Sequence, residues 1–222
     1  MVLTAPDEGW FEIGQEEREE PRYYPVQGRL LPSVTTVKGI IGHPYLQQWR
    51  GRVGNEQANQ VTNDAALYGQ AIHDFTAIMD MTGGGLEIIG TPPAEMYTQL
   101  SNYIVWRDRS VQEIVEVEKV VYSLAYGYAG KLDRVWVLKG DTLPSVGDIK
   151  TGTIRNIDRA QTAAYAQAYT EMTNRSIGRR GLVGVSRKTG KVRFKAHDDP
   201  GDFQGFLTLL AAYRWLESVG EV

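Results

Sequence analysis

The chain has 222 residues, a formal net charge of −3 and no cysteine. A hydrophobic content of 42% with 23% charged residues is ordinary for a globular protein, and no apolar run is long enough to span a membrane. These values exclude a membrane-embedded protein and an iron–sulfur cluster held by four cysteines, and the length suits one domain.

The N-terminal segment is acidic, with seven acidic residues and one base, Arg18, between residues 7 and 20. Targeting segments for secretion or for mitochondria begin with basic residues, so we expect neither and predict a cytoplasmic protein. Residues 1–22 are expected to form an acidic arm, and residues 23–222 a single domain.

A short hairpin is expected over residues 23–31, with its turn at Gln27-Gly28. Ser33 or Thr35 then caps a helix that runs through Ile41. The hydroxyls at this helix start could also bind phosphate, although plain capping is the simpler interpretation.

Further helices are expected along the next part of the chain. After a break at His43-Pro44 they cover residues 45–53 and residues 65–79, the second of them capped by Asn63-Asp64. Another helix follows Pro92-Pro93, and its expected buried face carries Tyr97, Leu100 and Ile104.

The second half of the chain predicts an α/β fold with a mixed central β-sheet flanked by helices. Apolar and β-branched runs indicate strands, and apolar residues at helical spacing indicate helices. The extra N-terminal helices would form a wall or arch beside the functional site. The expected strands cover residues 114–122, 128–137, 144–150, 181–186 and 192–195, and the expected helices cover residues 158–172 and 202–216.

Two carboxylates and a lysine lie on the central strands. Side chains alternate on a strand, so Asp148 and Lys150 point the same way while Ile149 points into the core. The turn over residues 139–141 can bring Asp133 beside Asp148, and two close carboxylates repel each other and raise one pKa. A bound Mg²⁺ or Mn²⁺ removes that conflict, polarises a phosphate and activates water. The alternative is a solvent-facing Asp-x-Lys, because short motifs often occur by chance.

Several motifs surround these residues in a fixed order. Residues 31–36 read Leu-Pro-Ser-Val-Thr-Thr, and a helical Gly69 and His73 follow; then come Gly130-x-x-Asp133, Asp148-Ile149-Lys150-Thr151-Gly152 and Gln161-x-x-x-Tyr165. Together they resemble the PD-(D/E)XK nuclease superfamily in its RecB-like exonuclease branch, which includes the mitochondrial genome maintenance exonuclease and phage exonucleases.

The resemblance implies a metal centre with a catalytic lysine, Lys150. Its metal ligands would be His73, Asp133, Asp148 and the backbone carbonyl of Ile149, with Glu118 as a further ligand. For His73, the alternative is a structural histidine on a helix. The resemblance also implies that the DNA backbone is held by Gln161, Tyr165, Ser33 and Thr35.

One segment of the chain is strongly basic although the net charge of the chain is negative. Residues 175–195 hold eight of the chain's 24 bases and no acid. Local basic patches rather than net charge attract a polyanion, so Arg179, Arg180, Arg187 and Lys188 are candidate DNA contacts. The alternative is a solvated hairpin with charged edges.

These expectations describe a Mg²⁺- or Mn²⁺-dependent exonuclease that hydrolyses linear DNA, with single-stranded DNA among its candidate substrates. Its expected setting is recombination, repair or replication in a bacterium or a phage-infected cell, with a recombination or single-strand-binding protein as a candidate partner and no membrane. Two alternatives stay open: a structure-selective endonuclease, and a non-catalytic DNA-binding accessory protein of recombination.

Overall fold

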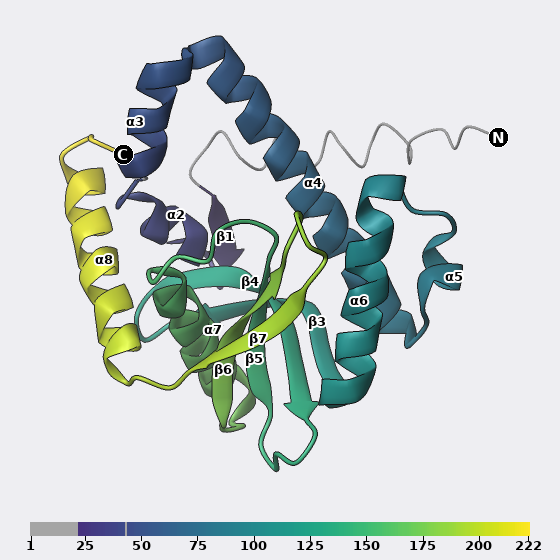
Figure 1. The fold of residues 1–222 in the computed structure, drawn as a ribbon. Coiled ribbons are helices and arrows are strands. Elements are labelled where there is room, and N and C mark those ends of the chain that lie inside the picture. Colours follow the sequence, from purple (N-terminus) through teal and green to yellow (C-terminus); the bar gives the residue numbers. More distant parts are fainter. Residues whose placement is uncertain (1–21, 43) are drawn as a thin grey trace.

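The computed structural model describes residues 22–42 and 44–222. It contains a five-stranded sheet in the order β3-β4-β5-β6-β7, parallel at β5–β6 and antiparallel at its other junctions. Helices lie on both faces of this sheet, which confirms the predicted fold class (Figure 1). The strands are β3 (Val111–Ser123), β4 (Tyr128–Leu138), β5 (Ser145–Lys150), β6 (Arg179–Val185) and β7 (Val192–His197).

The central strands are buried on both faces, and this explains their nearly continuous apolar runs. In β4, Leu132, Val135 and Trp136 are almost fully buried. A Cβ at Gly147 of β5 would lie 2.3 Å from the ring of Trp136, so only glycine allows these strands to pack this closely. Parallel pairing of β5 with β6 requires a crossover, and α7 (Asp158–Thr173) provides it.

Two apolar cores hold the layers together. On one face, α7 and α8 (Gly201–Ser218) pack with α2 (Val34–Gly39) against the sheet, and their core includes Tyr169 and Phe206. On the other face, α4 (Asn55–Thr82) and α6 (Ala94–Ser110) pack through Ile72 and Leu100.

The N-terminal part agrees with several expectations. Strands β1 (Tyr23–Val26) and β2 (Arg29–Pro32) form the predicted hairpin, and Gln27 and Gly28 have positive φ angles of 47° and 76° in its turn. Ser33 caps α2 by accepting a 2.9 Å hydrogen bond from the backbone N–H of Thr36. In Figure 1, α3 (Pro44–Val53) and α4 meet at an angle and rise above the sheet.

Some predicted boundaries are wrong. Helix α4 begins at Asn55 rather than Ala65, and Asn63 and Asp64 are exposed within it instead of capping it. Polar residues on the solvent side do not interrupt a helix whose other side is packed, so the break comes at Gly54, with a φ of 86°.

Three smaller differences follow. Helix α2 ends at Gly39, before Ile41, and a short helix, α5 (Leu86–Ile89), was not predicted. On α6, Tyr97 is 53% exposed, because Met96, Leu100 and Tyr103 form the buried face. The predicted acidic arm is outside the described residues except for Arg22, and His43 is outside them as well. Among the described residues, none of the helices has the length and apolar character to cross a membrane.

Candidate functional site

A pocket of about 890 Å³ lies where the strand ends of β4 and β5 face α2, α4 and α7. It brings together residues that are far apart in the sequence and were proposed from the motifs. These residues are Ser33, Thr35, His73, Glu118, Asp133, Asp148, Lys150, Gln161 and Tyr165.

The two aspartates lie on neighbouring strands, as predicted. Backbone pairing of β4 with β5 includes Arg134 opposite Gly147, and these two residues adjoin Asp133 and Asp148 along their strands. There the Asp133 side chain accepts a 2.6 Å hydrogen bond from the backbone N–H of Ile149. The carboxylate thus ties the middle of β4 to the end of β5 and is held in the pocket wall.

The pKa of Asp133 is raised to about 6, and burial is the largest cause. The negative charges of Asp148 and Glu118 add to the increase, whereas His73 opposes it. The expected repulsion between carboxylates therefore helps to raise the pKa of Asp133, but burial raises it more. A cation bound here would lower this pKa again and keep the carboxylate ionised.

Lys150 and Asp148 point the same way, as strand alternation predicted. The Lys150 Nζ lies 2.7 Å from Asp148 Oδ2, and Gln161 Nε2 donates a 2.8 Å hydrogen bond to Asp148 Oδ1. Burial works against the charge of Lys150, but Asp148 and Asp133 outweigh it and raise the pKa of the lysine. Lys150 is therefore held as an ammonium ion in the lining of the pocket.

Behind Gln161 lies a second lysine, Lys38 of α2, that the motifs did not indicate. Its Nζ donates a 2.8 Å hydrogen bond to Asp158 and another to the side-chain oxygen of Gln161. Because that oxygen faces the lysine, the amide nitrogen of Gln161 faces Asp148. Burial and the charge of Lys150 lower the pKa of Lys38. No local signal could reveal this contact, since Lys38 and Asp158 are 120 residues apart.

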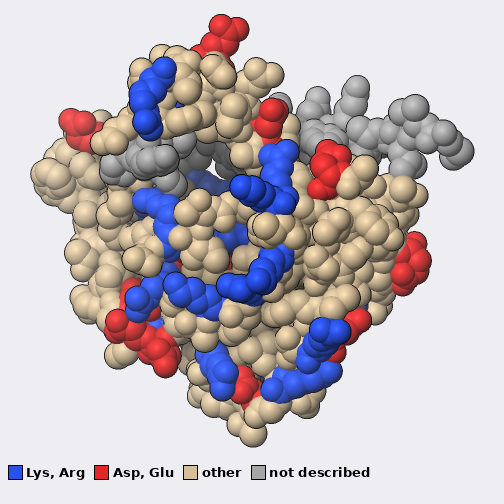
Figure 2. Space-filling view, viewed as in Figure 1, with Lys and Arg blue, Asp and Glu red and all other residues tan. Residues whose placement is uncertain are grey.

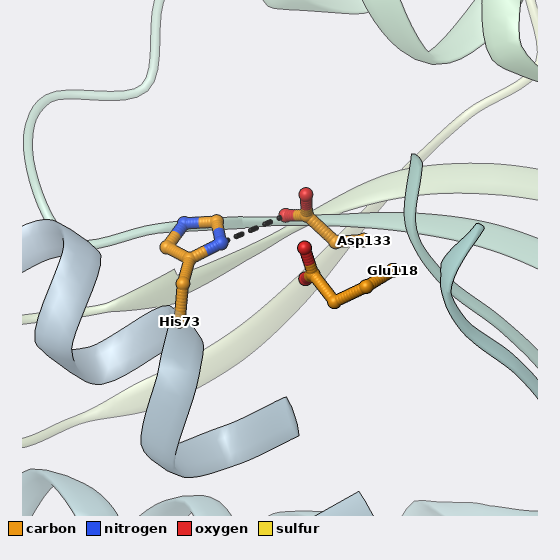
Figure 3. Close-up of side chains that lie close together, drawn as sticks. All are labelled: His73, Glu118 and Asp133. Atoms are coloured by element: carbon orange, nitrogen blue, oxygen red, sulfur yellow. Dashed lines mark ion pairs between the residues drawn. The ribbon is translucent and has the colours of Figure 1, made fainter. Parts of the chain in front are cut away.

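A possible metal centre lies beside Asp133. Ligand atoms of His73, Glu118 and Asp133 are all within 4.8 Å of one another, and His73 Nδ1 is 3.4 Å from Asp133 Oδ2 (Figure 3). Two carboxylates and one imidazole fit Mn²⁺ better than Mg²⁺, because Mn²⁺ accepts nitrogen ligands more readily. The donor set therefore fits a divalent cation, with His73, Glu118 and Asp133 as its ligands.

Asp148 and Ile149 do not belong to this group of three. Both oxygens of Asp148 already contact Lys150 and Gln161, and the N–H of Ile149 is the atom that contacts Asp133. Their predicted metal ligation stays a prediction.

Glu118 has an unusual backbone and two cationic partners. Its φ of 51° is in the left-handed region, which costs on the order of 1 kcal/mol or more for a residue with a side chain. Its carboxylate lies 3.0 Å from Lys131 Nζ and 3.1 Å from Arg134 Nη1. These contacts hold the side chain at the pocket and offset its charge.

Arg134 anchors this side of the site from below. It is fully buried and lies 2.7 Å from Asp80 Oδ2, and it also donates to Thr76 and to the backbone oxygen of Asp133. Asp80 in turn accepts a 2.6 Å hydrogen bond from Tyr103. The sequence places Arg134 on an apolar strand but gives no indication of Asp80, which lies 54 residues earlier on a helix.

Two glycines of the motifs allow close approach. A Cβ at Gly130 would lie 2.7 Å from the ring of Tyr165, so the missing side chain lets the tyrosine lie against β4. A Cβ at Gly69 would lie 3.1 Å from Thr151 Oγ1. The missing side chain of Gly69 therefore lets the segment that follows β5 approach α4.

The predicted DNA contacts are split between two regions. Arg187 and Lys188 lie in a groove that adjoins the pocket, as described below. Arg179 lies 3.1 Å from Asp141, and Arg180 lies 2.7 Å from Asp202, both at the opposite end of β6 from Lys150. The structure does not bring these two arginines to the pocket.

No protein-family model matches the chain, and no curated protein matches it. Among solved structures, the chain is similar to the crystal structure of SSO0001, with 15% identity, a TM-score of 0.42, and coverage of 94% of this chain and 85% of that one. It is also similar to a presumed exonuclease from Eubacterium rectale, with 12% identity, a TM-score of 0.37, and coverage of 57% of this chain and 55% of that one. Both likenesses are distant, so the functional inference depends on the pocket.

Proposed function

We propose that this protein is a Mg²⁺- or Mn²⁺-dependent deoxyribonuclease, and specifically an exonuclease of the RecB-like PD-(D/E)XK type. One observation carries the proposal. A set of metal-binding donors, His73, Glu118 and Asp133, shares a pocket with the paired side chains of Asp148 and Lys150. Few structural roles require two buried aspartates beside a histidine and a half-buried lysine at a solvent-accessible pocket.

The residues of the pocket would have different roles in catalysis. The divalent cation would supply polarisation of the phosphodiester and activation of the attacking water. Lys150 places a positive charge where charge develops on the phosphate, and its ammonium group can also orient water or give a proton to the leaving oxygen. Asp148 holds Lys150, and Gln161 holds Asp148, so both side chains are fixed before substrate binds.

Linear DNA is the proposed substrate, with single-stranded DNA among its forms. The setting we propose is recombination, repair or replication in a bacterium or a phage-infected cell, and a recombination or single-strand-binding protein is a candidate partner. These assignments rest on the motif resemblance together with the basic surface beside the pocket.

A degradation assay tests the proposal. End-labelled linear DNA and covalently closed circular DNA, each single- and double-stranded, would be incubated with Mg²⁺, Mn²⁺ or EDTA. We expect metal-dependent loss of the linear forms alone, and no loss with the Asp148→Ala variant. The labelled end then gives the direction of digestion.

Other outcomes would replace the proposal. Cleavage of closed circles would make the protein an endonuclease, and binding without cleavage in every metal would leave a non-catalytic DNA-binding accessory protein. Equal cleavage by the wild type and the Asp148→Ala variant would show that the activity does not come from this pocket.

A further inference from the structure

A second open groove of about 620 Å³ adjoins the catalytic pocket. It runs between the β6–β7 hairpin and the segment that follows β5. Thr151 and Gly152 line both hollows, so the groove begins directly after Lys150. A substrate that binds in the pocket and extends beyond its reacting group would therefore enter this groove.

The groove has charges of only one sign. Five bases line it and no acid does, whereas the catalytic pocket contains Glu118, Asp133 and Asp148. Within residues 22–42 and 44–222, none of the five forms an ion pair with an acid. Figure 2 shows Lys and Arg gathered on this face, next to a hollow in the surface. The five bases are Arg187, Lys188, Lys191, Arg193 and Lys195.

The backbone that presents these bases is fixed by helix α6. Gln99 of α6 donates a 2.7 Å hydrogen bond to the backbone oxygen of Arg187, and Asn102 donates a 3.1 Å hydrogen bond to that of Gly190. Gly190 has a φ of 66°, and a Cβ there would lie 2.6 Å from Thr98. The turn is therefore docked on α6, and little ordering would be needed when a ligand binds.

One basic side chain is also fixed. The guanidinium carbon of Arg187 lies 4.2 Å from the centre of the Tyr68 ring, a cation–π contact with the helix that carries His73. This contact places the charge of Arg187 between the groove and α4.

We propose that this groove, from Thr151 to Lys195, binds the phosphate backbone of a nucleic-acid strand that extends out of the catalytic pocket. The inference rests on the proposed nuclease function and deepens it, because it predicts a polymeric substrate held beyond the scissile phosphate. A repeating polyanion matches a row of bases without acids, and continuity with a phosphodiester site favours nucleic acid over an acidic peptide. Binding here is expected to be independent of base sequence.

The test is a binding measurement that does not depend on cleavage. Fluorescence anisotropy in EDTA would compare short and long oligonucleotides over a salt series, with the full chain and with a Lys191→Gln/Arg193→Gln/Lys195→Gln variant. This variant leaves the Arg187–Tyr68 contact intact. We expect about 10–100-fold weaker binding of the long oligonucleotide, and a slope of log Kd against log salt that falls by about 2.

A matched variant controls for lost charge. Arg29→Gln/Lys119→Gln/Arg175→Gln removes three bases outside both hollows, of which Arg29 and Arg175 are exposed and Lys119 is half-buried. It should bind the long oligonucleotide nearly as the wild type does. Equal losses in the two variants would overturn the groove as a specific site.

Two further results would overturn the inference while leaving the catalytic proposal untouched. In the first, the groove variant keeps the wild-type Kd and salt dependence, as expected if these bases are only a solvated sheet edge. In the second, polyglutamate of similar length binds as tightly as the oligonucleotide. Conversely, groove-dependent DNA binding with no cleavage in any metal would reject the nuclease function but not the groove.

Discussion

The catalytic pocket and the basic groove share Thr151 and Gly152, yet they use charge in opposite ways. In the pocket, charged side chains are buried or half-buried and are held by partners, as Asp148 is by Lys150 and Gln161. In the groove, the bases of β7, Lys195 and Arg193 among them, are exposed and have no acidic partner among the described residues.

The difference separates two tasks. Buried, paired charges cost desolvation energy, and they hold their geometry because every partner would lose an interaction if one moved. Exposed bases cost little and attract a polyanion without fixing where it reacts. We therefore expect changes in the pocket to affect reaction rate or stability, and changes in the groove to affect affinity.

The largest expected effect is on catalysis. Lys150→Ala should lower the cleavage rate by on the order of 10²–10⁴, because it removes a positioned charge at the reacting phosphate. The rate would be measured with saturating metal and DNA. Lys188→Ala, which removes a lysine from the groove, should keep the maximal rate. A Lys150→Ala enzyme as fast as the wild type would remove the lysine from the mechanism.

The next effect is on stability. Arg134→Met leaves Asp80 and Glu118 without their buried partner, and breaking such a pair costs about 3–5 kcal/mol of unfolding free energy. The melting temperature should fall by on the order of 10 °C in thermal denaturation. Arg193→Met, at an exposed groove position, should change stability by less than about 0.5 kcal/mol. Equal stability of the two variants would show that the buried network does not support the fold.

The smallest of these effects concerns orientation. Lys38→Met removes the donor that holds the side-chain oxygen of Gln161 away from Asp148. We expect the maximal rate to fall by about 10–100-fold, with little change in DNA affinity. The conservative Lys38→Arg variant should recover part of that rate, because it keeps a donor and a charge. A rate unchanged in Lys38→Met, at equal folded fraction, would show that Gln161 does not need this lysine.

The fold class and the central strands could be predicted because their signals are local. Alternating and continuous apolar runs placed β3 to β7 within a few residues, and the spacing between Asp148 and Lys150 was enough to put both side chains on one face. The start of α4 differs from the prediction because Asn63 and Asp64, which often cap helices, lie here on an exposed turn within the helix.

The supporting contacts of the site could not be predicted. Asp80 reaches Arg134 across 54 residues, and Lys38 reaches Asp158 across 120, so neither pair leaves a pattern within one element. The sequence shows the basic segment, but it does not show that Arg179 and Arg180 lie apart from the bases of the groove. Strand pairing places Arg179 and Arg180 opposite Ser145 and Val146, at the far end of β5 from Lys150.

The most direct test of the whole account is single-turnover cleavage measured over a series of enzyme concentrations. Lys150→Ala should lower the maximal rate and leave the half-saturating concentration near the wild-type value, whereas the Lys191→Gln/Arg193→Gln/Lys195→Gln variant should raise that concentration and keep the maximal rate. Two results would contradict this account. If Lys150→Ala kept the wild-type maximal rate, the chemistry could not be assigned to the pocket. If the groove variant lost its maximal rate while its half-saturating concentration stayed unchanged, affinity could not be assigned to the groove.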